Sequence, residues 1–232
     1  MSTLLGPVTS PAPGRYLISV LWSVSGRERA GKYPLSQVQM PSPIRLIVGL
    51  GNPGAEYAES RHNAGFWFVD HLARLYGGSF TRETKFHGHT CRIRIGGVAC
   101  WLLKPATFMN RSGQSVSAMV SYYRLPPEEM LVVHDELDLA PGVVRLKQGG
   151  GHAGHNGLRD IVSAIGGRDF WRLRFGIGHP GDSREVVSYV LGRPARCDTA
   201  EIEAALVKTT EIIGKLLLGD FQYAMHQLHT TG

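Results

Sequence analysis

Apolar positions along the chain follow two different periods, which predict an alternation of strands and helices. Apolar residues three and four positions apart predict helices over residues 63–76, 116–123 and 158–165. Short, mostly apolar runs predict strands, and residues 84–95 and 98–104 predict a hairpin across Gly96-Gly97; the other runs lie at 45–50, 130–133, 143–147 and 171–177. Because strands alternate with helices and the hairpin is antiparallel, we expect an α/β fold with a single domain, in which a twisted mixed β-sheet is sandwiched between α-helices.

The C-terminal part of the chain carries weaker signals. Residues 186–191 predict a short strand, and Asp198 with Glu201 matches a capping box that opens a long helix to about residue 218. Residues 221–232 are expected to be a frayed helix end. Further upstream, residues 105–112 and the Gly-rich stretch 148–157 predict loops.

Residues 1–43 show neither period and are rich in Ser, Pro, Gly and Arg. We expect them to be a disordered N-terminal extension, or the product of a start codon assigned too early, with Met40 as the natural start. The folded domain is then residues 44–232. Half of the formal net charge of +6 lies in residues 1–43, so the domain itself is only modestly basic. Such a charge is compatible with a nucleic-acid partner but does not establish one.

The three cysteines, Cys91, Cys100 and Cys197, form no C-x-x-C motif. This disfavours a disulfide framework and a zinc ribbon, and it favours a reducing, cytoplasmic compartment. No apolar run approaches the ~18 residues that a membrane span requires, so no membrane association is expected.

Candidate chemistry is densest in residues 44–64, IRLIVGLGNPGAEYAESRHNA. The Gly49-x-Gly51-x-x-Gly54 spacing matches a dinucleotide fingerprint. However, Pro53 interrupts the turn, and a predicted helix with Asp70 in its middle occupies the place of the required second strand. The carboxyl end of a strand is where open α/β sheets build their sites, so an active site at this turn is the stronger hypothesis.

His62 and Asp135 are the candidate general base and its partner. Asp135 follows an apolar strand, where a buried carboxylate needs a partner, and His62 can be that partner. A carboxylate that accepts the Nδ1 hydrogen of a histidine fixes its tautomer and raises the basicity of Nε2. Because no G-x-S-x-G motif or activated cysteine is present, water would be the nucleophile.

Other polar residues suggest how such a site would hold its substrate. Asn52, Asn110 and Asn156 follow predicted strands, and amides that converge on a histidine can position water and a carbonyl oxygen. Tyr57 and the Phe108-Met109 pair are candidates for a pocket wall. Seven cations near the same strand ends predict a phosphate-binding rim: Lys104, Arg145, Lys147, Arg159, Arg168, Arg172 and Arg174.

A metal site is an alternative for the same region. His134, Asp135 and Glu136 would supply ligands together with His152 and His155, which form an H-x-x-H pair in the Gly-rich loop. A metal of this kind needs three or four converging ligands, and the sequence does not fix the geometry of that loop.

The chain contains, in order, LIVGLGNPGAEYAESRHNAGFWFVD, KPATFMNRSGQSV, LVVHDELDLAPGVVRLKQGGGHAGHNGLRDI, RLRFGIGHPG and VSYVLG. From about residue 44 to the C-terminus, these stretches resemble the bacterial peptidyl-tRNA hydrolase family. Residues 1–43 lie outside the resemblance.

The resemblance implies a monomeric, cytoplasmic enzyme without cofactor, metal or obligate protein partner. Such an enzyme hydrolyses the ester between a peptide, or an N-blocked aminoacyl group, and tRNA, and so recycles tRNA from stalled or prematurely released translation products. His62 matches the catalytic base and Asp135 the carboxylate that orients it. Asn52, Asn110 and Asn156 match the asparagines that hold substrate and water, and Met109 is a further substrate-binding candidate. Tyr57 matches a tRNA-binding tyrosine, and Lys147 and Arg174 match basic positions that clamp the tRNA phosphates. The partner would be the acceptor stem and 3′ end of peptidyl-tRNA.

Three rival hypotheses remain at this point: an RNA-binding module without chemistry, a metal-dependent hydrolase and a dinucleotide enzyme. The roles of His134, His152 and His155 stay open.

Overall fold

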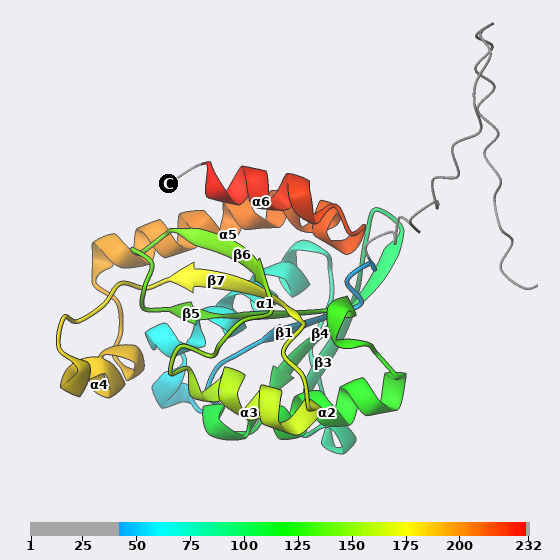
Figure 1. The fold of residues 1–232 in the computed structure, drawn as a ribbon, viewed down its shortest axis with the longest axis horizontal. Helices are drawn as coiled ribbons and strands as arrows, with labels where there is room; N and C mark the ends of the chain where they lie inside the picture. Colours follow the sequence, from blue (N-terminus) through cyan, green and yellow to red (C-terminus); the bar gives the residue numbers. More distant parts are fainter. Residues whose placement is uncertain (1–41, 231–232) are drawn as a thin grey trace, which may run out of the picture. The chain divides into compact units, whose positions relative to one another are not determined.

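The computed structural model describes residues 42–230, in which seven strands form one mixed sheet with the order β2-β3-β4-β1-β5-β7-β6 (Figure 1). Strands β4, β1, β5 and β7 are parallel, and the remaining three pair antiparallel. The bounds are β1 (Leu46–Gly49), β2 (Thr81–Glu83), β3 (Gly88–Ile95), β4 (Val98–Pro105), β5 (Met130–Glu136), β6 (Val144–Gln148) and β7 (Trp171–Gly176). The predicted α/β fold with a mixed sheet is therefore confirmed. The prediction for residues 1–43 lies, except for the last two positions, outside the described residues.

Helices cover both faces of the sheet. Helices α1 (Ala64–Leu75), α5 (Arg196–Leu217) and α6 (Phe221–His229) pack on one face, and α2 (Ser112–Tyr123) and α3 (Asn156–Ile165) pack on the other (Figure 1). Strand β1 shows why, because Ile47 belongs to the first core whereas Leu46 and Val48 belong to the second. This alternation is the period-two pattern of a strand that is buried on both faces.

The glycines of the GLGNPG turn serve close packing. A Cβ atom at Gly49 would clash with the carbonyl oxygen of Gly65, and one at Gly65 would clash with the backbone of Leu50 and Val133. Only glycine lets α1 approach the ends of β1 and β5 this closely. The contact holds the short 3₁₀ turn Arg61–Asn63, which precedes α1, above the carboxyl ends of these strands.

The predicted strand at 186–191 is wrong. These residues form helix α4 (Val186–Leu191), which lies beyond the carboxyl ends of β5 and β7 (Figure 1). Val186, Tyr189 and Val190 pack against the first core at helical spacing, whereas Val187 is exposed. The local preference of β-branched residues for strands is therefore overridden by packing.

Two further predictions near the C-terminus are wrong. Helix α5 has Ala195 at its N-cap, so Asp198 lies inside the first turn and forms no capping box. Residues 221–229 form a separate helix, capped by Asp220, rather than a frayed end. The helix docks because the Phe221 ring stacks on Trp171 with 3.8 Å between ring centroids.

Three element boundaries also differ from the prediction. Helix α2 begins at Ser112 rather than near 116, and residues 84–86 form a 3₁₀ turn before β3 begins at Gly88. Strand β5 continues to Glu136 because it pairs with β7 as far as Gly176. His134 and Asp135 therefore lie on the strand, not after it. Among the described residues, no helix combines the length and apolar character needed to cross a bilayer.

Candidate active site

A cavity of about 500 Å³ opens at the carboxyl ends of β1 and β5. Its walls come from the turns after β1 and β4, the end of β5, the Gly-rich loop and α4. Six of the predicted site residues line it: Asn52, His62, Met109, Asn110, Asp135 and Asn156. The structure thus brings the candidate base, its carboxylate and all three predicted asparagines to one cavity.

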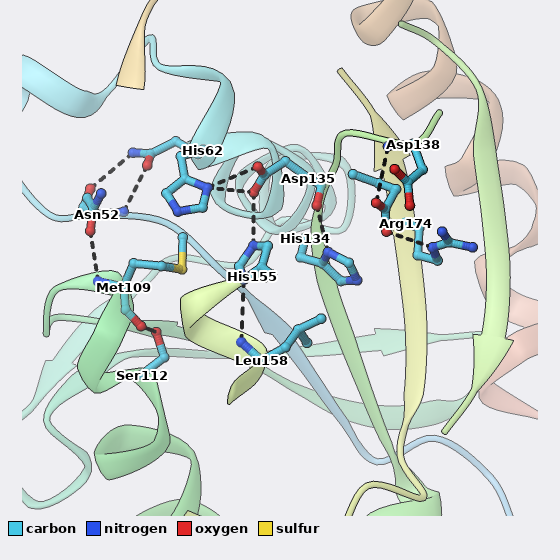
Figure 2. Close-up of polar contacts among 12 residues, drawn as sticks. Asn52, His62, Met109, Ser112, His134, Asp135, Asp138, His155, Leu158 and Arg174 are labelled. Carbon is cyan, nitrogen blue, oxygen red and sulfur yellow. Dashed lines mark hydrogen bonds and ion pairs between the residues drawn. The ribbon is translucent and has the colours of Figure 1, made fainter. Parts of the chain in front are cut away.

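His62 and Asp135 are in direct contact, as the sequence predicts (Figure 2). The Nδ1 atom of His62 lies 2.9 Å from each carboxylate oxygen of Asp135, whose residue is only 4% exposed. A carboxylate can only accept, so Nδ1 carries the hydrogen. This tautomer leaves the Nε2 atom of His62 with a free lone pair, and no described side chain is hydrogen-bonded to it.

His155 is a second donor to Asp135, which the sequence did not indicate. Its Nε2 atom lies 3.1 Å from Oδ1 of Asp135, and its Nδ1 accepts the backbone N–H of Leu158 at the start of α3 (Figure 2). Because Nδ1 accepts, the hydrogen of neutral His155 must lie on Nε2 and be donated to Asp135. Asp135 therefore holds two histidines in complementary tautomers.

The pKa values of His62 and Asp135 move apart in this arrangement. Burial alone would lower the pKa of His62, but the neighbouring Asp135 carboxylate outweighs it and raises that pKa. Burial alone would raise the pKa of Asp135, but the charges and hydrogen bonds of His62 and His155 outweigh it and lower that pKa. The pair is thus built to keep Asp135 ionised and to favour a proton on His62.

Asn52 is held by a backbone-like pairing with Asn63. The Asn63 side chain accepts the N–H of Asn52 at 2.8 Å and donates to its carbonyl at 3.0 Å. Asn63 occupies the N-cap position of α1, but its side chain does not cap the helix because it makes these bonds instead. The Oδ1 of Asn52 accepts the N–H of Met109 at 2.8 Å, which leaves its amide hydrogens as the group that faces the cavity.

His134 is fully buried, and burial lowers its pKa to about 3. Its Nδ1 donates to the backbone carbonyl of Asp135 at 2.7 Å, and its Nε2 is buried without a hydrogen-bond partner among the described residues, so His134 stays neutral. The predicted metal ligands therefore do not converge. Within residues 42–230, one group has metal-ligand geometry, and it consists of His62, Asp135 and His155. In this group the Nδ1 of His62 and the Nε2 of His155, which a metal would need, already donate hydrogen bonds to Asp135.

Three predicted substrate-binding residues lie outside the cavity. Tyr57 is half-buried and contacts the cavity residue Phe108 edge-on, at 6.3 Å between ring centroids. Lys147 is exposed near the end of β6. Arg174, on β7, donates its Nε hydrogen to Glu136 at 2.9 Å, with 24% of its side chain exposed.

The predicted cationic rim is only partly present. Arg172 is 3% exposed and points into the protein, which contradicts its place in the rim. Lys104 pairs with Asp70 at 2.6 Å, and Arg145 donates to the carbonyl of Leu228. The exposed members of the set, Lys147, Arg159 and Arg168, form no ion pair within the described part of the chain.

Comparisons with known proteins agree on one family. The family model described as peptidyl-tRNA hydrolase matches residues 46–232. The chain is 54% identical over 187 residues to the peptidyl-tRNA hydrolase of Methylobacillus flagellatus, which covers 81% of this chain and 97% of that protein. It is 52% identical over 191 residues to that of Nitrosomonas europaea, which covers 82% of this chain and 98% of that protein.

Solved structures give the same result. The crystal structure of peptidyl-tRNA hydrolase from Acinetobacter baumannii matches with a TM-score of 0.78 at 51% sequence identity. The match covers 80% of this chain and 94% of that chain. The similarity in sequence and the similarity in fold therefore both extend over most of the chain.

Proposed function

The chain belongs to the peptidyl-tRNA hydrolase family and hydrolyses peptidyl-tRNA, and we propose that His62, oriented by Asp135, is the general base of this reaction. One observation carries the proposal. The Nδ1 of His62 lies 2.9 Å from both oxygens of a buried Asp135, while the ring itself lines the cavity. His62 thus offers a basic Nε2 where a substrate can reach it.

The reaction then runs as a water-mediated acyl transfer. The Nε2 of His62 takes a proton from water as that water attacks the ester carbonyl, and Asp135 stabilises the imidazolium that forms. The carbonyl oxygen becomes an oxyanion, the bond to the ribose oxygen breaks, and the imidazolium returns the proton to that leaving oxygen. The products are a free peptide carboxylate and tRNA.

The asparagines would bind the charged and polar parts of the transition state. The amide hydrogens of Asn52 are free to donate towards the cavity, because its Oδ1 faces the N–H of Met109, and this suits Asn52 to the developing oxyanion. Asn110 and Asn156 are exposed at the cavity and keep both their donor and acceptor atoms, which suits them to the peptide backbone and the water. A peptide of variable sequence has to be held mainly through its backbone.

The tRNA would lie along the end of the sheet that carries Lys147 and Arg174. Lys147 is exposed, and the terminal nitrogens of Arg174 are not used by its bond to Glu136. Both suit phosphate contacts at the acceptor stem. Tyr57 supports the cavity wall through Phe108 and is proposed to contact the 3′ end.

His62→Ala tests the proposal, with His71→Ala as the matched control, a half-buried histidine of α1 that does not line the cavity. General-base catalysis is worth about 10²–10⁴-fold, so we expect turnover of an N-blocked aminoacyl-tRNA to fall by that factor while tRNA binding is retained. Near wild-type turnover in His62→Ala would refute the assignment. The same assay with EDTA tests the metal hypothesis, and we expect no loss of rate.

We also propose that the enzyme works as a monomer in the cytoplasm, where translation produces its substrate. The proposal is supported by the cavity, whose walls are complete within one chain. Light scattering after size exclusion should give a mass near 25.4 kDa. A mass twice as large at micromolar concentration would contradict the monomer.

A further inference from the structure

Four cations lie on one face of the sheet where β6 and β7 pair. Arg145 is opposite Arg174, and Lys147 is opposite Arg172. The residues between them, such as Leu146 and Leu173, point into the first core, so the four cations branch from the other face. Because β6 is an edge strand, the Arg145 side chain still reaches the carbonyl of Leu228 on α6. Like charges directly opposite one another are unfavourable, so the placement needs a physical reason.

Arg172 differs from the other three cations because it is buried. Its Nη2 donates to the carbonyl of Gly150 at 2.8 Å, and its Nη1 donates to the carbonyl of Gly151. Its guanidinium lies 4.8 Å from the centroid of the Phe170 ring, and its Nε is buried without a partner. Burying a charge that forms no ion pair with a carboxylate is costly, so the pair of hydrogen bonds to the two carbonyls is the interaction to explain.

Gly150 and Gly151 begin the Gly-rich loop that carries part of the cavity. His152, His155 and Asn156, which follow them, all line the cavity. Gly149, Gly150 and Gly154 adopt positive φ here. Glycine populates many other conformations as readily, so the loop sequence has little local preference for this shape. A loop of this composition keeps one shape only if contacts outside it hold it there.

We propose that Arg172 is a positioning residue that anchors this loop with the carbonyls of Gly150 and Gly151 turned inward. In a trans peptide the N–H points opposite to the C=O, and the described residues contain no cis peptide. The N–H groups of Gly151 and His152 therefore point away from Arg172, and neither has a hydrogen-bond partner in the described chain. The anchor presents the positive ends of these peptide groups, rather than the negative ends, to a polyanionic substrate.

The anchored loop also contacts both the proposed tRNA-binding lysine and the proposed catalytic pair. The side chain of Lys147 lies against Gly150, because a Cβ atom there would come within 2.9 Å of its Nζ. On the other side of the loop, His155 donates to Asp135. Displacing the loop would therefore disturb both the exposed lysine and the tautomer network of His62.

The inference rests on the proposed roles of His62 and Asn156, and it can be tested independently of them. In Arg172→Ala we expect amide hydrogen exchange to accelerate in residues 149–155, while α5 and the sheet stay protected. We also expect kcat to fall about 10–100-fold, since misplacement of catalytic groups by about 1 Å has effects of this size. Hydrogen exchange needs no turnover, so it separates a failure of this inference from a failure of the general-base proposal.

Chemical rescue of Arg172→Ala and the conservative variant Arg172→Lys show whether the hydrogen bonds of Arg172 or only its positive charge are needed. Guanidinium ion at tens of millimolar should restore activity and loop protection to Arg172→Ala, whereas urea and sodium chloride should not. Arg172→Lys keeps the charge but offers a single nitrogen, so we expect it to behave like Arg172→Ala. Full activity in Arg172→Lys, or unchanged exchange in the loop, would overturn the proposal.

Arg74→Gln is the matched control, because Arg74 is exposed on α1, which packs on the opposite face of the sheet from Arg172. If Arg172 instead bound phosphate directly, Arg172→Gln would reduce the salt dependence of binding by about one counterion and leave kcat unchanged. That result would also refute the anchor. If Arg172→Ala is too unstable to purify, Arg172→Lys and Arg172→Gln carry the same exchange and kcat measurements.

Discussion

Asp135→Asn is the most informative single substitution in the site, because it removes one charge and changes the tautomers around it. His155 can only donate from Nε2, since its Nδ1 accepts the N–H of Leu158. His155 will therefore donate its hydrogen bond to the single oxygen of the new amide, and the NH₂ group of that amide will face His62. The Nδ1 of His62 must then accept, which places the hydrogen on Nε2 and removes the base.

The size of the effect follows from the same contacts. The charges of imidazolium and carboxylate are spread over several atoms and lie about 4 Å apart, where their attraction is about 4 kcal/mol at an effective dielectric constant of about 20. Losing this stabilisation corresponds to about a thousand-fold in rate. The reversed tautomer adds to the loss, so we expect kcat to fall by at least about a thousand-fold with little change in KM.

Single-turnover hydrolysis of an N-blocked aminoacyl-tRNA between pH 5 and 9 measures this prediction, with the exposed Asp138→Asn as control. The wild-type rate should fall as the pH drops through the raised pKa of His62, because only the neutral imidazole is a base. In Asp135→Asn the acid limb should move to lower pH. A kcat within about tenfold of wild type would refute the reasoning.

The reasoning also predicts how Asp135→Asn combines with a second substitution. Without His155, the new amide is free to rotate and offer its oxygen to His62. His155→Ala should therefore reduce activity in the wild-type background but leave Asp135→Asn unchanged or partly restored. Additive losses in the double variant would show that His155 does not compete for this oxygen.

Two further predictions concern His134 and Lys147. Because the pKa of His134 is lowered to about 3 in the fold, the unfolded chain binds one more proton between about pH 6.5 and 3, and stability falls as the pH drops through this window. His134→Phe should reduce the slope of unfolding free energy against pH by about 1 kcal/mol per unit there, measured by urea denaturation; an unchanged slope would contradict the buried neutral state. Lys147→Gln should lower the salt dependence of tRNA binding by about one counterion without changing kcat, whereas Lys208→Gln on α5 should change neither. Equal slopes for Lys147→Gln and wild type would remove Lys147 from the tRNA contact.

Local pattern in the sequence was sufficient for most of the fold. The spacing of apolar residues, at two positions for strands and at three to four for helices, located α1 and all the longer strands. It did so because these elements bury one or both faces against a core. Spacing failed at α4 and α6. Whether Val186–Leu191 is a strand or a helix depends on whether a strand partner is available, and the docking of α6 depends on the distant Trp171.

Local motifs also located the candidate site residues but not the hydrogen bonds between them. The position of Asp135 after an apolar run was enough to predict a buried carboxylate with a histidine partner, and the two are in contact. Nothing local indicated that His155 is a second donor to Asp135, because the two residues are twenty positions apart in the sequence and a glycine-rich loop lies between them. The opposite error occurred at Arg172, which lies between Arg168 and Arg174 in the sequence but whose side chain is buried.

The sequence by itself determined which residues lie at strand ends, because backbone period and turn chemistry act over a few residues. It also determined the family, through motifs that run in order from residue 46 to the C-terminus. Only the tertiary structure decided which donors share the oxygens of Asp135, which face of Asn52 is free and where the charge of Arg172 goes. The physical reason is that a hydrogen-bond partner or a buried charge is assigned by competition among groups that are distant in the chain, and each buried group has to be satisfied there.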